Sequence, residues 1–524
     1  MARTPRSRRL LPSVVAAVAA LALLAGCGGS DVQDQASGAA AETNPNAAAD
    51  TTTTDSTTTD PASTGANVAA APAASGTGAV SPSNTAAGAV APANTSGKAA
   101  KTDPASTAGK KAVDSSATGT GTPVEKLVAS AAIFGGTAPC KPATLSPVNI
   151  GNVSTLSGVL GELFSPVTPA LETFVASQNA CGGLNGHKIQ FFQADDQGDP
   201  ATAASKAQEL IQSKKVIAFT GNIQVLTVDA AMPIYKRFNI PVIGADLTNN
   251  TWFTNSIAFP QGSGPQSIAY GYLVGATQYH KVKNVGNIWC IEVPRACEQI
   301  NRAYVELAPK FGATMKKTIQ VSLTAPSYVQ QCLEFKNAGV ESLAMTIDAA
   351  SQVRLARSCQ QVGWFPKITP YPLSVGNEKQ FFGNAWLGNA YVPMNHFPWM
   401  DNSTPATKYY QAAVKKYNPG FTTGGAASLG WGSGALLVAA AAGLTPENPT
   451  TQQLLDTLYT FKGQKFTELG GLTGPLTFNK GGFPKIPYCL FAAVSNDANT
   501  GWKTVISKPT CTDVTAPSDP QNQA

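Results

Sequence analysis

The sequence is poor in the residues and motifs on which catalysis and metal binding most often depend. It contains three histidines, His187, His280 and His396, which lie far apart in the chain. Neither a Cys-x-x-Cys pair nor a His-Glu-x-x-His motif occurs, so a zinc site has no support. The Gly-x-Ser-x-Gly elbow of serine hydrolases and the Gly-x-x-x-x-Gly-Lys-Ser/Thr phosphate loop are missing as well. We therefore expect neither an enzyme nor a bound metal or cofactor.

The chain also lacks a strong net charge once its first residues are set aside. The 37 Lys and Arg against 31 Asp and Glu give a formal charge of +6. Four of the basic residues, Arg3, Arg6, Arg8 and Arg9, open the chain, and removing these four from the 37 leaves 33 basic residues and a net charge of +2. This balance implies no nucleic-acid partner.

An apolar run of about sixteen residues, Leu10 to Ala25, follows these arginines and predicts a signal peptide, not a transmembrane helix. The run ends in Leu-Ala-Gly-Cys, which resembles the lipobox of bacterial lipoproteins. The resemblance implies that residues 1–26 are removed and that Cys27 becomes a lipidated N-terminus on the outer face of the cytoplasmic membrane. The alternative is an ordinary secreted protein cut near this point.

Residues 27–124 contain almost no large apolar side chain, as in DTTTTDSTTTDPASTG. Such a segment cannot bury enough surface to fold, so we expect a disordered tether rich in Ala, Thr, Ser, Gly and Pro. A random coil of about a hundred residues spans on the order of 50–60 Å, which is a useful reach through a cell wall. The alternative is a disordered tail whose length serves no purpose.

Apart from Cys27 the chain has eight cysteines, an even number that predicts four disulfides outside the cytoplasm. Eight cysteines allow 105 pairing schemes, and we predict the one that joins near neighbours in the sequence. Two of these bonds have an expected setting: one closes a short loop at a strand end that faces a cleft, and one joins two helices that flank the strand SLAMTID. The predicted pairs are Cys140–Cys181, Cys290–Cys297, Cys332–Cys359 and Cys489–Cys511.

After an entry segment, residues 125–146, strand-like and helix-like blocks alternate. The blocks VNIGNVST, IQFFQADD, VIAFTG and IPVIGA read as strands, and the pattern begins again after FPQGSG. Strands that recur between helices, several of them continuous apolar runs, predict parallel sheets covered on both faces. About 365 residues are too many for one ordinary core, so we expect two similar lobes.

The segments VNIGNVSTLSG, ASQNACGGLNGHKIQFFQADDQGDPATAASKAQELI and IAFTGNIQ follow one another as in type I periplasmic binding proteins. The chain most closely resembles the leucine/isoleucine/valine-binding family of ABC importer receptors. The resemblance implies two doubly wound parallel-sheet lobes joined by three crossovers near residues 260–265, 387–393 and 470–475, with ligand between the lobes. It also implies a binding domain over 147–510, with lobe 1 at about 147–262 and 390–470, lobe 2 at about 265–387 and 473–510, and a tail over 511–524.

Loops that leave the carboxyl ends of parallel strands converge at one edge of a sheet and lead into helix N-termini, so the ligand site is expected there. An amino acid would need donors for its carboxylate, an acid for its ammonium and an apolar wall. The candidate ligand-binding residues are Ser154, Leu156, Ser157, Asn222, Ile223, Gln224, Val225, Asp246, Thr248, Trp289, Asp348 and Tyr371.

The sequence departs from the amino-acid-binding members at two places. Val225 stands where they carry a carboxylate-binding serine, although Thr248 matches a threonine that contacts the ligand. The loop that usually brings a glutamate to the ammonium reads YPLS and has no acid. We expect Asp348 or Asp246 to take that role; the alternative is that each only caps a helix.

Two other candidates have simpler interpretations. Trp289 at a strand end is typical of a core residue, and His187, in a tight turn before a strand, is expected to be solvated. Neither position needs a ligand to explain it.

These observations predict an extracytoplasmic solute-binding lipoprotein of an ABC importer. Its partners would be a small solute, the permease and ATPase subunits, and the membrane through the lipid on Cys27. The expected solute is a branched-chain or other hydrophobic amino acid, and the alternative is a solute such as an amide, urea or an aromatic acid. A ligand sensor and a structural protein of the cell wall are the other functions that the sequence leaves open.

Overall fold

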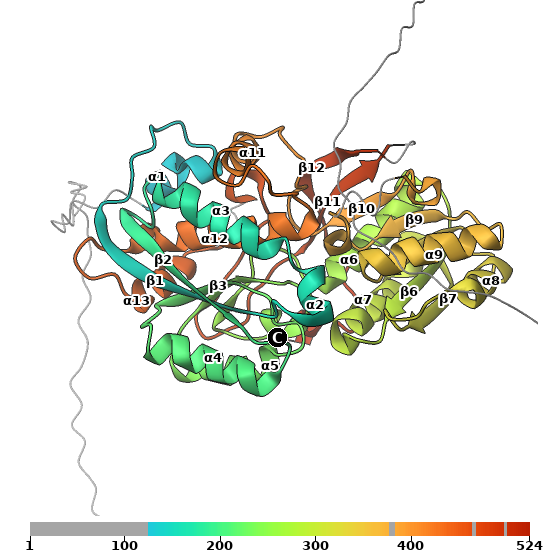
Figure 1. The fold of residues 1–524 in the computed structure, drawn as a ribbon, viewed down its shortest axis with the longest axis horizontal. Helices are drawn as coiled ribbons and strands as arrows, with labels where there is room; N and C mark the ends of the chain where they lie inside the picture. The colour runs from blue at the N-terminus through green and yellow to red at the C-terminus, as the bar shows by residue number, and fades with distance from the viewer. Residues whose placement is uncertain (1–123, 377–382, 464–467, 497–499, 524) are drawn as a thin grey trace, which may run out of the picture. The chain divides into compact units, whose positions relative to one another are not determined.

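The computed structural model describes residues 124–376, 383–463, 468–496 and 500–523 (Figure 1). Cys27, the predicted signal peptide and the predicted tether up to residue 123 lie outside the described residues. The description starts at α1 (Val124–Ser130) and a 3-10 helix (Ala132–Phe134), which precede the first strand.

The first lobe is built on a five-stranded parallel sheet in the order β2-β1-β3-β4-β5. Its first strand, β1, lies between β2 and β3; Ile150 is the partner of Phe191 on one side and of Ala218 on the other. The helices α2 (Gly158–Leu163), α3 (Val167–Asn179), α4 (Pro200–Gln212) and α5 (Val228–Arg237) follow the strands in turn. The strands are β1 (Leu145–Ser154), β2 (His187–Asp195), β3 (Ala218–Asn222), β4 (Val242–Ala245) and β5 (Ala258–Phe259).

The second lobe repeats this plan on four parallel strands in the order β7-β6-β8-β9. The order is that of the first four strands of lobe 1, so the predicted repeat and the doubly wound α/β class are both confirmed. The strands are β6 (Asn284–Cys290), β7 (Thr314–Val321), β8 (Ser342–Thr346) and β9 (Lys367–Pro370). The helices are α6 (Pro265–Leu273), α7 (Pro294–Leu307), α8 (Val329–Asn337) and α9 (Ala349–Gln361).

A third, antiparallel sheet was not predicted. It consists of β10 (Tyr391–Met394), β11 (Tyr488–Ser495) and β12 (Trp502–Thr512), and Cys489 and Cys511 face each other across β11 and β12. The strand β12 continues past residue 510, and the buried Asp519 accepts a hydrogen bond from the Tyr488 hydroxyl. Residues 511–523, expected as part of a tail, therefore belong to the folded unit.

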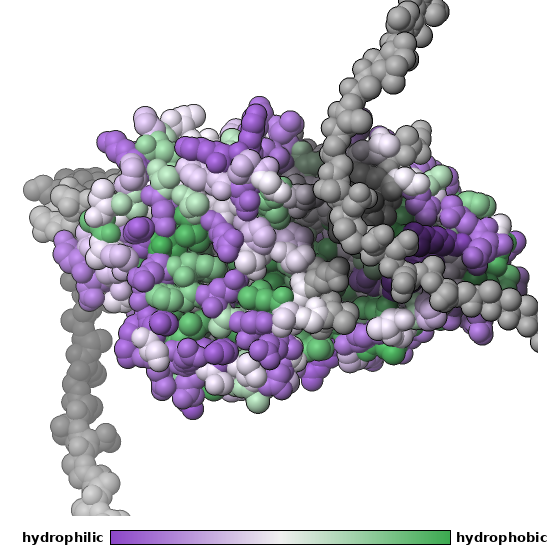
Figure 2. Space-filling model, viewed as in Figure 1, coloured by the Kyte–Doolittle hydropathy of each residue, from purple (hydrophilic) through white to green (hydrophobic). Residues whose placement is uncertain are grey.

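The chain returns to lobe 1 through α11 (Pro405–Tyr417), α12 (Gly425–Ala440) and α13 (Thr451–Leu458). Every residue of α12 is buried, and a Cβ on Gly434 would lie 2.5 Å from the Phe174 ring of α3, so the two helices pack closely only with glycine there. Among the described residues, the Gly425–Gly443 segment alone is long and apolar enough to cross a membrane, and it is wholly inside the fold. The face seen in Figure 2 is mostly hydrophilic with smaller hydrophobic patches, as expected when the most apolar helix is in the core.

The three connections between the lobes lie side by side. The Asn395 side-chain amide donates to the Ser263 carbonyl at 2.9 Å, and the Ser263 hydroxyl donates to the Pro487 carbonyl at 2.7 Å. The first connection falls where it was expected. The third lies directly before β11, later than the expected 470–475, because Phe478 still packs on Phe259 of lobe 1. The second lies after β10, because residues 391–394 form a strand, so the expected position of 387–393 was several residues early.

All four predicted disulfides are present: Cys140–Cys181, Cys290–Cys297, Cys332–Cys359 and Cys489–Cys511. The Cys332–Cys359 bond joins α8 and α9, which flank β8, as expected.

The prediction for His187 was wrong. This side chain is fully buried, and its Nδ1 and Nε2 lie 2.7 Å and 3.0 Å from the carbonyl oxygens of Ser146 and Thr445. The turn before His187 passes through Gly183 and Gly186, which both have positive φ. It places the ring against the loop that contains Thr445, more than 250 residues later in the chain.

Candidate functional site

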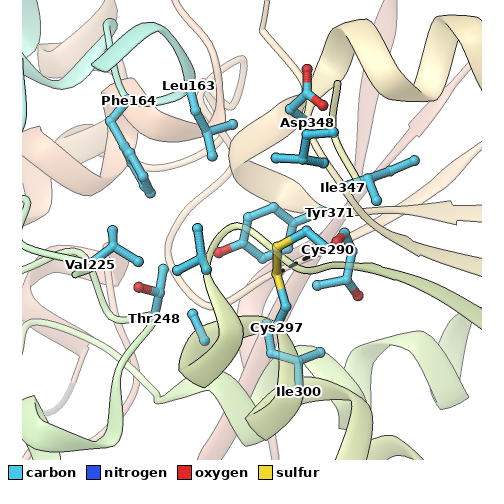
Figure 3. Close-up of a pocket in the computed structure, with 14 residues that line it drawn as sticks. Leu163, Phe164, Val225, Thr248, Cys290, Cys297, Ile300, Ile347, Asp348 and Tyr371 are labelled. Carbon is cyan, nitrogen blue, oxygen red and sulfur yellow. Dashed lines mark hydrogen bonds between the residues drawn. A yellow bond between two sulfur atoms is a disulfide. The ribbon is translucent and has the colours of Figure 1, made fainter. Parts of the chain in front are cut away.

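A pocket lies where the carboxyl ends of strands from both lobes face each other (Figure 3). It contains about 400 Å³ of empty space, part of it open to solvent. Lobe 1 contributes the end of α2 and the loops after β3 and β4. Lobe 2 contributes the ends of β6 to β9 and the first turns of α7. The lining residues are Leu163, Phe164, Val225, Thr248, Cys290, Val293, Ala296, Cys297, Ile300, Leu323, Thr346, Ile347, Asp348 and Tyr371.

Most of this lining is apolar. The exceptions are Thr248, Thr346, Asp348 and Tyr371, and among the described lining residues none is Lys, Arg or His. An apolar wall with a few polar groups is typical of sites for small, largely apolar molecules. The one charged group among the described lining residues is a carboxylate, which disfavours a solute whose only charge is negative.

Asp246 is buried beneath the pocket and does not line it. Its Oδ1 accepts hydrogen bonds from the Thr248 N–H at 2.9 Å and the Thr248 hydroxyl at 2.6 Å. Its Oδ2 accepts from the Gln224 N–H and the Trp252 indole N–H, both at 3.0 Å. Burial raises the pKa of Asp246, and these donors oppose the shift. Both oxygens are engaged, so the expectation that Asp246 meets a ligand ammonium is corrected: it holds the loops together.

Thr248 does line the pocket, but its role differs from the expected one. Because its hydroxyl proton points to Asp246, its oxygen presents only lone pairs to the pocket. Thr248 can therefore accept a hydrogen bond from a solute and does not donate one to a carboxylate.

The other polar candidates of lobe 1 bond to one another and not to the pocket. The Ser154 hydroxyl donates to Asn152 Oδ1 at 2.8 Å and accepts from the Ile223 N–H at 2.9 Å. The Asn222 amide donates to the Tyr235 hydroxyl at 3.0 Å and to Gln224 Oε1 at 3.2 Å. The loops after β1 and β3 are thereby fixed, which makes the lobe 1 wall rigid.

Leu156 and Ser157 are exposed at the end of β1 and lie outside the pocket lining. The Leu156 N–H donates to Asp195 Oδ1 at 2.9 Å. Partial burial would raise the pKa of Asp195, but hydrogen bonds from Leu156, Ser157 and Gln197 lower it below its usual value. The ionised Asp195 carboxylate therefore holds this loop in place.

Asp348 combines the two roles considered for it. Its Oδ2 accepts from the Ala350 and Ser351 N–H groups at 3.0 and 3.3 Å, so it caps α9. Its Oδ1 is buried and has no hydrogen-bond partner among the described residues. One oxygen therefore serves the helix, and the other has no partner among the described residues.

Tyr371 brings its ring into the pocket, and its hydroxyl points toward the side on which Val225 and Thr248 lie (Figure 3). No described residue forms a hydrogen bond with that hydroxyl, although the residue is only 8% exposed. Burial raises the pKa of Tyr371 well above its ordinary value, so the hydroxyl stays protonated and can donate.

Trp289 is half-buried on β6, packs against the core and is absent from the lining, which fits the interpretation as a core residue. Four of the twelve candidates thus line the pocket: Val225, Thr248, Asp348 and Tyr371.

Sequence reasoning missed most of the apolar wall. The α7 residues were accessible to it, because the first turn of the helix after a cleft-facing strand belongs to the same edge of the sheet. Thr346 and Ile347 directly precede Asp348 and could have been named with it. The Leu163 and Phe164 contacts had no local signal. Cys290 and Cys297 were predicted at a strand end that faces the cleft, though not as ligand contacts; the missed residues are Leu163, Phe164, Val293, Ala296, Ile300, Leu323, Thr346 and Ile347.

Comparison with known proteins agrees with this architecture. The family model described as periplasmic binding protein matches residues 147–497. An amino acid binding protein of Pseudomonas aeruginosa is 35% identical over 71 residues, which are 14% of this chain and 19% of that protein, so the match spans about a fifth of the relative's length.

Two solved structures have a similar fold. A branched chain amino acid ABC transporter structure from Thermus thermophilus with bound valine has a TM-score of 0.59 at 14% identity, covering 70% of this chain and 97% of that one. A solute binding protein of an ABC transporter from R. palustris, in complex with benzoate, has a TM-score of 0.56 at 15% identity, covering 71% and 99%. The match to the family model spans well over half of the sequence and includes every strand of both parallel sheets but the first residues of β1. The chain belongs to the periplasmic binding protein family, whose members bind solutes and are not enzymes.

Proposed function

We propose that this protein is the extracytoplasmic solute receptor of an ABC importer and that its solute is a hydrophobic amino acid of the branched-chain type. One observation carries the proposal. The pocket between the lobes is mostly apolar, and its described lining holds a single carboxylate, Asp348, one oxygen of which has no partner among the described residues.

The charges at the pocket favour a zwitterion over a simple acid. A monoanion would meet the Asp348 carboxylate with no Lys, Arg or His in the described lining to offset the repulsion. An amino acid brings an ammonium group that can donate a hydrogen bond to Asp348 Oδ1. The Tyr371 hydroxyl, which has no described partner, can donate to the carboxylate.

Two of the similar proteins support an amino acid as the solute, and a third has a different ligand. The matching Pseudomonas protein is described as amino acid binding, and one similar structure holds valine. Another similar structure holds benzoate, so the fold by itself does not choose the solute.

The attachment to the membrane rests on the sequence alone. Lipidation at Cys27 would anchor the protein outside the cytoplasmic membrane, and the segment up to residue 124 would tether the binding domain within reach of the permease. Delivery to permease and ATPase subunits completes the proposed role.

The decisive experiment compares two ligands on two proteins by calorimetry: leucine and its uncharged analogue 4-methylpentanamide, on native protein and on Asp348→Asn. Asparagine caps helices about as well as aspartate, so the substitution spares α9. Losing a charge-assisted hydrogen bond should weaken leucine about ten- to a hundredfold and leave the amide nearly unchanged.

A matched control is Asp199→Asn, because Asp199 caps α4 in lobe 1 by accepting from the Thr202 N–H at 2.7 Å. This variant should bind leucine like the native protein. If native protein ignores leucine, or if Asp348→Asn binds it as tightly as native, the amino-acid assignment is rejected.

A second candidate is a solute without an ammonium group, such as an amide or urea. The observation that favours it is the bond between Thr248 and Asp246, which removes one donor and one acid from the site. Tight binding of 4-methylpentanamide by native protein that ignores leucine would select this candidate.

A further inference from the structure

The two lobes also touch outside the solute pocket, along one face of α7. Arg295 of α7 forms an ion pair with Asp229 at the start of α5 in lobe 1. One turn later on α7, Gln299 Oε1 accepts a hydrogen bond at 3.1 Å from the N–H of Asn250, in the lobe 1 loop between β4 and β5. Residues four apart lie on the same face of a helix, so both contacts belong to one strip. Figure 1 shows α5 and α7 next to each other.

The lobe 1 side of this strip is already assembled. Asp229 Oδ1 accepts from the Thr251 hydroxyl at 2.8 Å, which joins α5 to the 3-10 helix η2 (Asn250–Phe253). The Thr251 N–H in turn donates to Asn249 Oδ1 at 3.0 Å. Asp229 and the Asn250 N–H are therefore presented together to α7.

The contact is of a kind that can open and close. Both members of the ion pair are exposed, at 62% for Arg295 and 47% for Asp229, and Arg295 borders a pocket that is lined mainly by polar residues and is partly open to solvent. Polar groups regain water when such a contact separates, so opening costs little, whereas parting an apolar interface would expose surface to water. Neither Asp229, Arg295, Gln299 nor Asn250 lines the solute pocket.

We propose that Asp229, Arg295, Gln299 and the Asn250 amide form an interlobe latch that stabilises the closed form and thereby sets solute affinity without touching the solute. The latch rests on the proposed function as a solute receptor. A solute held from both sides binds the closed form best, so its apparent affinity is its intrinsic affinity scaled by the fraction of closed protein. Breaking the latch must then weaken every solute by the same factor.

The affinity arm of the test uses Asp229→Asn, Arg295→Gln and the exchanged pair Asp229→Arg with Arg295→Asp, with leucine and valine as probes. Exposed ion pairs are weak, so each single variant should lower both affinities by about two- to fivefold and by an equal factor. The exchanged pair should recover most of the loss. The matched control is Lys317→Gln, which breaks the 3.0 Å ion pair with Glu334 inside lobe 2 and should change neither affinity.

A second arm needs no solute. The Asn250 amide is protected by Gln299 only while the lobes touch, so hydrogen exchange of residues 249–253 should become faster in Asp229→Asn and Arg295→Gln and stay native in Lys317→Gln. If leucine and valine fail to bind, the proposed solute is rejected, and the hydrogen-exchange experiment still tests the latch. Native exchange in both latch variants, unequal factors for the two solutes, or an exchanged pair no better than the singles would each overturn it.

Discussion

The two lobes share a strand order, but they differ in how the polar groups at their strand ends are hydrogen-bonded. In lobe 1 the polar groups at the strand ends bond to one another, and Asp246 alone accepts four hydrogen bonds. In lobe 2 several buried polar atoms near the strand ends have no partner among the described residues: Trp289 Nε1, Glu292 Oε2, Asp348 Oδ1 and Gln352 Oε1. Lobe 1 has one such atom, Gln224 Nε2 in the loop after β3, but of all these residues only Asp348 lines the pocket, so the unpartnered buried oxygen at the pocket wall belongs to lobe 2.

Both lobes fix their loops with a carboxylate, and lobe 2 adds a disulfide. In lobe 1 a buried carboxylate gathers the loops after β3 and β4. In lobe 2 the Cys290–Cys297 disulfide ties the end of β6 to the start of α7, and both cysteines line the pocket. Glu292 Oε1 also accepts from the Ser322 hydroxyl and the Leu323 N–H, both at 2.7 Å, which ties the loop after β6 to the loop after β7.

The strongest test of this contrast removes each carboxylate in turn. Asp246→Ala leaves four donors without an acceptor and should lower the free energy of unfolding by about 4 kcal/mol. Asp348→Ala removes a helix cap and should cost about 1 kcal/mol. Urea unfolding of both variants measures the two values. Equal losses would mean that Asp246 is no more structural than Asp348, and the contrast between the lobes would fall.

The disulfides of lobe 2 sharpen the comparison, because one lies at the pocket and one does not. Cys290–Cys297 and Cys332–Cys359 are separated by 7 and 27 residues. Loop-closure entropy predicts that removing them costs about 2.5 and about 3.6 kcal/mol of stability, so the bond away from the pocket matters more for folding. Affinity should have the reverse order: about tenfold weaker leucine binding for Cys290→Ala with Cys297→Ala, and native binding for Cys332→Ala with Cys359→Ala.

Calorimetry and thermal unfolding on the two double variants give both rankings. A pocket disulfide that could be removed without loss of affinity would mean that the loop of lobe 2 is held by its packing, and the covalent tie would have no part in solute binding.

Much of the fold followed from the sequence because burial leaves a periodic trace. Continuous apolar strands such as VIAFTG between amphipathic helices specified parallel sheets, and cysteines close in sequence paired as expected. The antiparallel sheet was not predicted because β10 is only four residues long and pairs with β11, which lies almost a hundred residues later in the chain. No local pattern encodes such a pairing.

The site followed less well, because hydrogen-bond direction is a property of the assembled loops. Thr248 and Asp246 were correctly placed after β4, yet nothing in the sequence shows that the Thr248 proton goes to Asp246. The burial of His187 was missed for the same reason. One of its partners is the Thr445 carbonyl, far along the chain, and nothing in the local sequence indicates that contact.

The smallest expected effect separates one hydroxyl of each lobe. Thr248→Val keeps the shape of the side chain and removes a hydroxyl whose proton already belongs to Asp246, so leucine affinity should fall by no more than about threefold while stability falls by about 1 kcal/mol. Tyr371→Phe removes a buried hydroxyl with no described partner; the folded protein loses no hydrogen bond, so stability should be unchanged or slightly higher. Leucine affinity should fall about tenfold, because only the solute carboxylate uses that donor. Calorimetry and urea unfolding on both variants therefore give opposite patterns, and a Thr248→Val variant that loses more affinity than Tyr371→Phe would return the recognition of the carboxylate to lobe 1.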